Sequence, residues 1–189
     1  LNLLNVNLTR NINENLKEYI ESTLFPEYSK NEEGHGIAHI KDVLRRSFNL
    51  IDENNLEVDC NMVYVIAAYH DIGHHIDSKT HEIISADIMF KDEKLKNFFS
   101  DEERQIIKEA IEDHRSSKEN EPRSVYGKLI SSADRNTRIE IVFIRSFFVA
   151  HERMPETNIE EYLDYTIERL SKKYDEENPE NMFFEDKTY

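Results

Sequence analysis

Apolar residues recur along most of the chain at the spacing of α-helices. The clearest stripe, at steps of three and four, is formed by Ile40, Val43, Leu44, Phe48 and Ile51. A stripe of this width is typical of a helix that lays one face on a protein core and turns the other to solvent. The pattern predicts a helix over about residues 35–52, and it predicts no sheet anywhere in the chain.

The same periodicity, punctuated by capping and turn-forming residues, predicts further helices. Their approximate ranges are 13–24, 58–71, 80–90, 101–114, 124–136, 137–152 and 158–173. The first should end before Pro26, because a residue that precedes proline avoids the helical conformation. Thr80 and Asp101 are the predicted N-caps of two helices, and Arg104 in place of Glu or Gln leaves no reciprocal capping box after Asp101. Gly73 suits the exit from the helix over 58–71.

The predicted helix over 58–71 is apolar nearly all round from Val63 to Tyr69, so we expect it to be central and buried. It runs directly into His70 and Asp71. Burying an imidazole beside a carboxylate is costly unless another group pairs with them. The sequence therefore raises the question of what that partner is.

Composition fits a single all-α domain of 189 residues, a compact multi-helix bundle, with only 4 Gly and 4 Pro. We divide it into a motif-bearing core over about 33–138, C-terminal helices over 139–174 and an acidic tail over 175–189. Within that tail, Met182, Phe183 and Phe184 are apolar enough to dock on the body.

The formal net charge of −15 argues against a nucleic-acid backbone as the main partner. It is compatible with a small anionic substrate where local cations outweigh the overall field. The single cysteine, Cys60, excludes an internal disulfide and fits a reducing compartment. No apolar run approaches the roughly 18 residues of a membrane span, so we expect a cytoplasmic protein with no membrane partner. The oligomeric state is not readable from the sequence.

Several predicted helices each turn an imidazole or a carboxylate toward the core, in line with apolar residues. These residues are His39, His81, His114 and Asp134, which join the pair His70 and Asp71. Any one of these histidines alone is more often an ordinary core or surface residue. Together they are hard to pair internally, and charged groups are seldom buried unless paired or bound to metal. Because imidazole and carboxylate are ligands of divalent metals, the set predicts a metal site between helices.

The order His39, His70-Asp71, Asp134 resembles the H…HD…D signature of the HD-domain superfamily of metal-dependent phosphohydrolases. "HGIAHIKDVLRR" looks like the family's first-histidine helix, "AAYHDIG" like its HD helix and "KLISSADR" like the helix with the last aspartate. "HEIISA" and "IEDH" look like the extra-histidine segments of the subgroups with five or six ligands. The resemblance covers about residues 33–138.

The resemblance implies that His39, His70, Asp71 and Asp134 bind one metal ion. Asp71 would bridge to a second ion, whose other ligands would be His81 and His114. It implies one or two divalent metal ions per chain. The identity of the metal stays open among Mn, Fe, Mg, Zn, Ni and Co. The chain departs from two specialised subgroups. It has His74 where cyclic-dinucleotide phosphodiesterases have Lys and lacks their GYP motif, and it lacks the Glu-Asp pair of the alarmone hydrolases.

Such a centre is suited to hydrolysis of a phosphoric ester or anhydride, because a bound metal activates water and polarises the phosphoryl group. Asp71 would serve as ligand and as acceptor for the attacking water. His74 is the preferred donor to the leaving oxygen, with His75 and His114 as alternatives. The alternative for the pair His74-His75 is a solvated turn.

Cationic residues next to the predicted ligands are candidates for binding the phosphate of the substrate, and we call them phosphate clamps. The candidates are Arg135, Arg138, Arg115 and Lys79, with Arg135 first because it adjoins Asp134. For any single one, an ordinary surface charge is the plainer interpretation. We expect the substrate to be a small phosphorylated compound, foremost a nucleotide.

Three functions remain open at the level of the sequence. The first is a metal-dependent phosphohydrolase acting on a phosphomonoester or phosphoanhydride. The second is a di-iron oxygenase, since the superfamily includes oxygenases that hold two irons with the same ligand pattern. The third is a non-catalytic, metal-stabilised helical regulatory module.

Overall fold

The fold is that of a computed structural model, which describes residues 12–115, 120–135, 142–144, 146–147, 150–151, 154, 156–173 and 183–187. Every regular element within these ranges is helical, and they contain no strand. This confirms the predicted all-α class. Among the described helices, none is both long enough and apolar enough to cross a bilayer.

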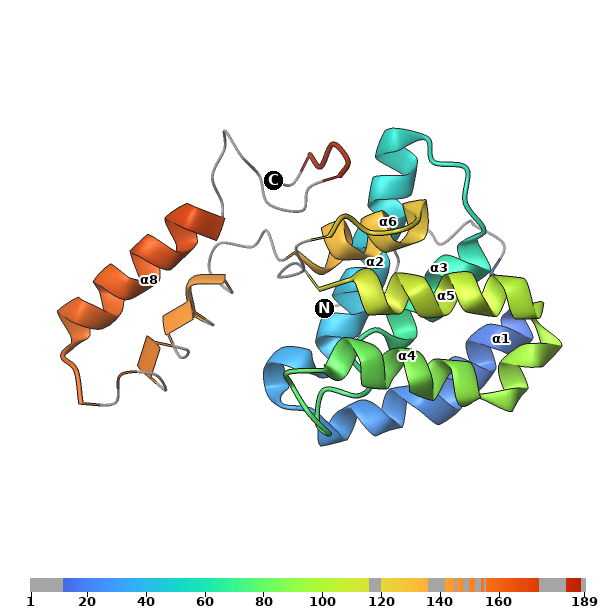
Figure 1. The fold of residues 1–189 in the computed structure, drawn as a ribbon, viewed down its shortest axis with the longest axis horizontal. Coiled ribbons are helices and arrows are strands. Elements are labelled where there is room, and N and C mark those ends of the chain that lie inside the picture. Colours follow the sequence, from blue (N-terminus) through green and yellow to red (C-terminus); the bar gives the residue numbers. More distant parts are fainter. Residues whose placement is uncertain are drawn as a thin grey trace, which may run out of the picture.

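Figure 1 shows the helices in sequence order from blue to red. The short opening elements are α1 (Glu14–Tyr19), the π-helical η1 (Ile20–Leu24) and the 3₁₀ turns η2 (Phe25–Lys30) and η3 (Glu33–His35). The core helices are α2 (Ile37–Asn54), α3 (Cys60–Tyr69), α4 (His81–Lys91), α5 (Asp101–Asp113) and α6 (Val125–Asp134), with the 3₁₀ turn η4 (Glu93–Asn97) between α4 and α5. The last helix is α8 (Ile159–Lys173).

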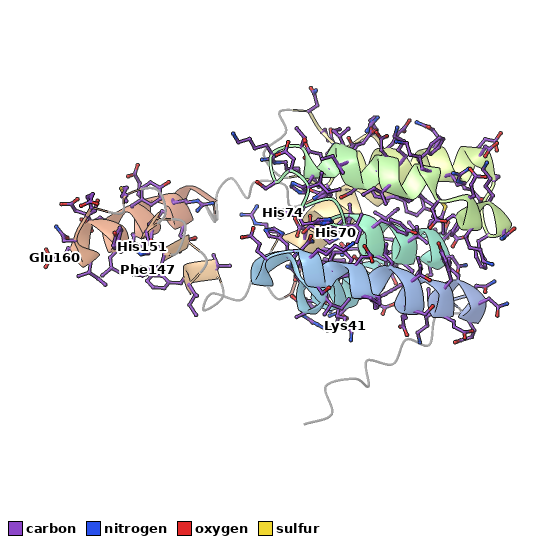
Figure 2. All side chains as sticks on the ribbon, turned by 90° about the horizontal axis from the view of Figure 1, so that it is seen from below. Lys41, His70, His74, Phe147, His151 and Glu160 are labelled. Atoms are coloured by element: carbon purple, nitrogen blue, oxygen red, sulfur yellow. The ribbon has the colours of Figure 1, made fainter. Side chains whose placement is uncertain are left out.

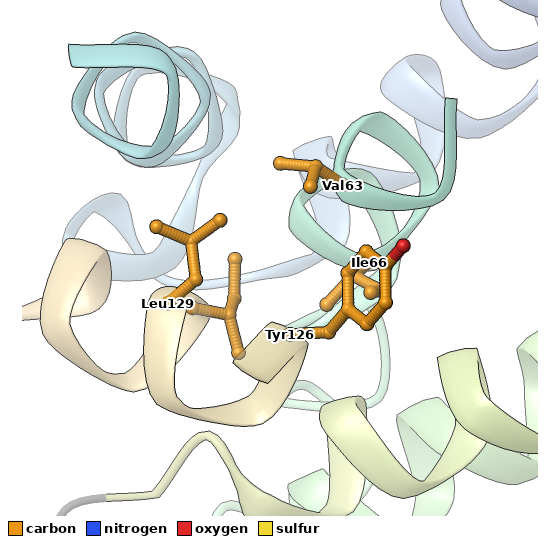
Figure 3. A pocket seen from close by; sticks show the side chains of 5 residues that line it. Val63, Ile66, Tyr126 and Leu129 are labelled. Carbon is orange, nitrogen blue, oxygen red and sulfur yellow. The ribbon is translucent and has the colours of Figure 1, made fainter. Parts of the chain in front are cut away.

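Helix α3 is the centre of the fold, as its apolar sequence predicts. Its residues from Met62 to Tyr69 are all buried, and α2, α5 and α6 pack around it. Figure 3 shows the contact with α6, where Val63 and Ile66 face Tyr126 and Leu129 and leave no room for a water molecule. A fully buried central helix fixes the position of whatever follows its last turn, and here that is His70-Asp71.

The predicted helix over 13–24 corresponds to α1 and η1, which end at Leu24, before Pro26 as expected. Unlike the prediction, the last of these turns are π-helical, and the chain continues in the 3₁₀ turn η2 as far as Lys30. Pro26 sits in the first turn of η2, where its missing N–H leaves no intrahelical bond unmade. Within η2, Tyr28 is buried and its hydroxyl donates a 2.7 Å hydrogen bond to the carbonyl of Ala68. This contact ties the opening turns to the end of α3.

Of the two predicted N-caps, one is wrong and the other makes no capping bond. Ser100, rather than Asp101, caps α5, and its side chain and that of Glu103 form the reciprocal capping box that the prediction had excluded. Thr80 precedes α4 but makes no side-chain cap, because its hydroxyl donates to Asp77 Oδ2 at 2.7 Å instead. Thr80 thus occupies the N-cap position as predicted but makes no capping bond, whereas the cap of α5 moves by one residue, to Ser100.

Gly73 follows the end of α3, as predicted, but the structure gives a steric reason for the glycine. No described glycine has a positive φ. A Cβ at position 73 would instead lie 2.7 Å from Ile84 Cγ2 and 2.9 Å from Ile84 Cβ. The absence of a side chain therefore allows the turn after α3 to approach the first turn of α4 closely.

In the C-terminal part, α8 lies away from the core (Figure 1) and residues 183–187 contact the core again. Helix α8 stands apart from the core in both views (Figures 1 and 2), and Tyr162 packs there edge-on against Phe147 at 5.7 Å between ring centroids. Residues 183–187 lie back on the core, where Phe184 is partly buried. The predicted docking of the tail aromatics is seen for Phe183 and Phe184, whereas Met182 lies outside the described residues.

Candidate metal centre

The ends of five helices converge and carry the predicted ligands. His39 is in the first turn of α2, His81 opens α4 and Asp134 closes α6. His70 and His114 are the C-cap residues of α3 and α5. Side chains at helix ends lie beyond the regular packing of the bundle, so they can meet at one place while the helices themselves bury apolar faces. The structure brings together all six predicted ligands: His39, His70, Asp71, His81, His114 and Asp134.

One group of side chains gathers around Asp71 Oδ2. His39 Nε2 lies 3.0 Å from Asp134 Oδ1 and 3.3 Å from His70 Nε2. The same two nitrogen atoms each lie 3.4 Å from Asp71 Oδ2. His70 Nε2 and Asp134 Oδ1 are 3.8 Å apart. This is the set that the resemblance assigns to one metal ion.

A second group faces the other oxygen of the same carboxylate. His81 Nε2 lies 3.3 Å and His114 Nε2 lies 3.5 Å from Asp71 Oδ1. The two imidazoles approach each other to 3.2 Å between their Nε2 atoms. Asp71 thus presents one oxygen to each group, which is the arrangement that a bridging carboxylate requires.

Backbone carbonyls fix which nitrogen of each ring faces the centre. The Nδ1 atoms of His70, His81 and His114 lie 2.8, 2.9 and 2.7 Å from the carbonyl oxygens three residues earlier in the chain. A carbonyl oxygen only accepts, so each Nδ1 carries a proton and the neutral ring presents an unprotonated Nε2 to the centre. The Nε2 atoms of His81 and His114 lie 3.2 Å apart. At this distance their lone pairs repel each other unless a proton or a cation lies between them.

The spacing of these atoms fits a metal ion. For ligand bonds of about 2.1 Å, neighbouring ligand atoms lie about 3.0 Å apart in an octahedron and about 3.4 Å apart in a tetrahedron. The spacings within the two groups run from 3.0 Å to 3.8 Å. Donor types, tautomers and spacing therefore all agree with a divalent cation in each group.

The pKa shifts of these side chains also favour a positive charge between them. Burial opposes ionisation of Asp71, but His70 and its other imidazole neighbours outweigh this and hold the pKa of Asp71 well below its ordinary value. The pKa of Asp134 is likewise well below its ordinary value, because His39 and His70 outweigh the effect of burial. The two carboxylates in turn raise the pKa of His39 and, more strongly, of His70 against the opposing effect of burial. Protons on these imidazoles occupy the place that a cation would take.

The centre has a closed and an open side. The side chains of His70 and Asp71 are 0% and 2% exposed, whereas Asp134 is 30% and His35 is 23% exposed. The open side of the centre is therefore the one at Asp134 and His35, with the His70-Asp71 pair at the floor.

His35 is a site residue that the sequence analysis missed. Its Nδ1 lies 2.8 Å from Asp71 Oδ2, and its ring stacks on that of His74 with centroids 3.8 Å apart. Asn31 supports this arrangement, because its Nδ2 donates to the carbonyls of both His35 and Asp71 at 2.9 Å. The spacing of His35 and His39 in "HGIAH" was the available signal, but His35 belongs to η3 and not to α2, so helical periodicity did not reveal it.

Of the pair His74-His75, only His75 matches the predicted solvated turn, and a catalytic role for His74 stays a prediction. His74 lies over the centre beside His35 and His81, and Figure 2 shows it in the same part of the core as His70. Burial, reinforced by His35, lowers the pKa of His74 to about 4, so its ring is neutral near pH 7 in the absence of substrate. His75 is exposed and bonds to Asn31 Oδ1 at 3.1 Å, as expected of a solvated turn.

The predicted phosphate clamps occupy varied surroundings. Arg135 follows Asp134 directly and is only 4% exposed. Arg115 Nη1 lies 3.4 Å from Glu82 Oε2 and donates to the backbone carbonyl of Lys79. Lys79 itself is exposed. Arg138 lies outside the described residues. A substrate-binding role for these four residues stays a prediction.

Comparisons with known proteins agree with this geometry. A family model for the HD domain matches residues 36–139, a range that includes all six predicted ligands. The fold is similar to the crystal structure of a predicted HD superfamily hydrolase from an uncultured Thermotogales bacterium, with a TM-score of 0.53 and 19% identity over 84% of each chain. A search of curated proteins found no match. On the family match and the His/Asp clusters typical of such sites, this chain belongs to the HD domain family.

Proposed function

We propose that this protein is a metal-dependent phosphohydrolase that cleaves a phosphomonoester or phosphoanhydride bond in a small phosphorylated compound, foremost a nucleotide. The observation that carries the proposal is the position of Asp71, whose two oxygens face two separate groups of imidazole nitrogens. A shared carboxylate between two ligand groups supports a pair of metal ions, which is an arrangement suited to phosphoryl transfer. Family membership supports the same conclusion.

Each group of residues has a distinct part in the proposed chemistry. A divalent cation bound here supplies Lewis acidity and lowers the pKa of water from about 15.7 toward about 7. Asp71 orients the attacking water as a hydrogen-bond acceptor, and His35 holds Asp71 Oδ2 in place. His74, neutral near pH 7, donates a hydrogen bond toward the leaving oxygen on the open side of the centre.

Substrate binding must overcome the net charge of −15. The cations themselves offset part of this repulsion, and Arg135, Arg138, Arg115 and Lys79 are the proposed clamps. Arg115 already pairs with Glu82, so it would contact phosphate with the guanidinium nitrogens that this carboxylate leaves available. Glu82 then serves to orient Arg115 toward the ligand helices.

The ligand chemistry favours a transition metal over magnesium. Imidazole nitrogen suits Fe, Ni and Zn, and the carboxylates of Asp71 and Asp134 also suit Mn, whereas Mg favours oxygen ligands and retains its waters. We propose one ion held by His39, His70, Asp71 and Asp134 and a second held by Asp71, His81 and His114. Asp71 is the residue common to both.

Elemental analysis of the purified protein, followed by a phosphate-release screen over nucleotides with each metal, tests the proposal. We expect release by wild-type protein, and none by an Asp71→Asn variant that has lost metal but keeps its helical circular-dichroism signal. Asp87→Asn is the matched control, because Asp87 is a 45% exposed carboxylate on α4 that pairs with Lys108. Metal binding without release of phosphate from any substrate would favour the regulatory module. Oxygen uptake with bound iron would favour the oxygenase.

A further inference from the structure

The C-terminal residues 183–187 contact α2 and α6 through the backbone. Phe183 N donates to Ser132 Oγ at 3.2 Å, on α6. On α2, the side chain of Asn54 pairs with Glu185 in both directions, accepting from Glu185 N at 3.1 Å and donating to Glu185 O at 2.9 Å. Lys187 N donates to a carboxylate oxygen of Glu53 at 3.3 Å. Main-chain bonds from one short segment thus reach two different helices.

A buried ion pair anchors the middle of this segment. Arg46 Nη2 lies 2.8 Å from Asp186 Oδ2, and the two side chains are only 5% and 4% exposed. The same nitrogen lies 3.5 Å from the carbonyl oxygen of Ser132. An arginine buried on α2 therefore contacts both α6 and the C-terminal segment. Removing either charged partner would leave the other buried without compensation, which is strongly unfavourable.

The two helices joined in this way carry two ligands of the same proposed metal ion. Arg46 lies about two turns after His39 on α2, so the two residues lie on nearly the same helix face. Ser132 lies two residues before Asp134 at the end of α6. His39 Nε2 and Asp134 Oδ1 are 3.0 Å apart across this helix pair. Any slip of α2 against α6 would change that distance.

We propose that residues 183–187 form a strap that holds α2 against α6 and thereby sets the separation of His39 and Asp134. Arg46 and Asp186 are then positioning residues for the metal centre. The effect on metal rests on the proposed function, whereas the strap itself does not. Because the contacts of the strap run to α2 and α6, the strap acts on the ion held by His39 and Asp134 and leaves the ion held by His81 and His114, on α4 and α5, in place.

Mn(II) titration of the protein, followed by electron paramagnetic resonance, tests the strap. We expect Asp186→Asn to weaken one Mn(II) site about tenfold or more, as follows when support for a metal ligand is lost, and to leave the second site unchanged. Asp186→Glu, which keeps the charge, should restore binding at the weakened site. Leu95→Ala is the stability control, because Leu95 is fully buried in η4 and is not in the contacts of the strap. It should lower the melting temperature with no change at either Mn(II) site.

Two results would overturn the strap. One is wild-type affinity at both sites in Asp186→Asn, and the other is an equal loss at both sites in Asp186→Asn and Leu95→Ala. Wild-type protein that binds no divalent metal would contradict the proposed function instead. In that case hydrogen exchange tests separately whether the strap exists. The amides of Phe183, Glu185 and Lys187 should exchange slowly in the wild type and fast in Asp186→Asn. Fast exchange in the wild type would exclude the strap.

Discussion

His35 Nδ1 lies 2.8 Å from Asp71 Oδ2, the oxygen that also faces His39 and His70. The contact comes from η3, outside the helices that carry the six predicted ligands. A donor at this distance fixes the orientation of a carboxylate that has to serve two groups at once. His35 would therefore act on the proposed metal centre through Asp71.

Replacing His35 tests this role. We expect His35→Ala to weaken metal binding by about 10–100-fold, as is typical for the loss of a residue that orients a ligand. His151→Ala is the matched control, because His151 is an exposed histidine that contacts Tyr162, away from the centre in Figure 2. Isothermal titration with Mn(II) gives both affinities. Equal affinities in the two variants would show that Asp71 needs no support from His35.

Removal of metal should lower stability sharply. Ligands that must converge from separate helices favour the folded state when an ion is bound, because the unfolded chain presents no such site. Free metal at about 100 times its dissociation constant adds about 2.7 kcal/mol per site. For a chain of this size that corresponds to a melting temperature about 5–10 °C higher. A thermal melt that is the same with saturating Mn(II) and with excess chelator would contradict two-group metal binding.

The pH dependence follows from the raised pKa values of His39 and His70. Both lie above the ordinary 6.5 in the metal-free protein, so the stabilisation from protonated imidazoles is complete below about 6.5 and is lost as pH rises through the raised values. Metal and proton compete for the same Nε2 atoms, so metal affinity should increase over this range. The gain in melting temperature from Mn(II) should therefore be larger at pH 8 than at pH 6. A gain that shrinks toward alkaline pH would oppose this.

The close approach at Gly73 predicts a coupling between the turn after α3 and the position of His81. Gly73→Ala places a Cβ 2.7 Å from Ile84 Cγ2, within the helix that His81 opens. We expect a loss of about 1–3 kcal/mol in the free energy of unfolding, which is typical of overpacking, together with weaker binding at the His81–His114 group. Urea denaturation and Mn(II) titration measure the two effects. Ile76→Ala, at a 59% exposed position in the same turn, should change neither.

Periodicity predicted the helices because most of them bury one continuous face or all of their surface. The stripe from Ile40 to Ile51 and the apolar run from Val63 to Tyr69 correspond to buried residues of α2 and α3. The ligands were found for a related reason, since His81, His114 and Asp134 continue the apolar faces of their helices. Polar residues on a buried face stand out in a sequence.

Features that depend on contacts between segments could not be predicted in this way. His35 lies in a short 3₁₀ turn with no periodic face, and its importance comes from a contact across 36 positions in sequence. The partner of Arg46 is 140 positions away, so a buried cation on α2 had no visible compensation in the sequence. The reason for Gly73 is the proximity of Ile84, and no local turn pattern contains that information.

The most direct test is anomalous diffraction from a crystal of the protein loaded with Mn(II). We expect two anomalous peaks about 3.5–4 Å apart, one on each side of the Asp71 carboxylate. The first should be bound by His39, His70 and Asp134, and the second by His81 and His114. Peaks elsewhere, or no ion at Asp71 in protein that has been saturated with metal, would contradict a metal centre built on Asp71.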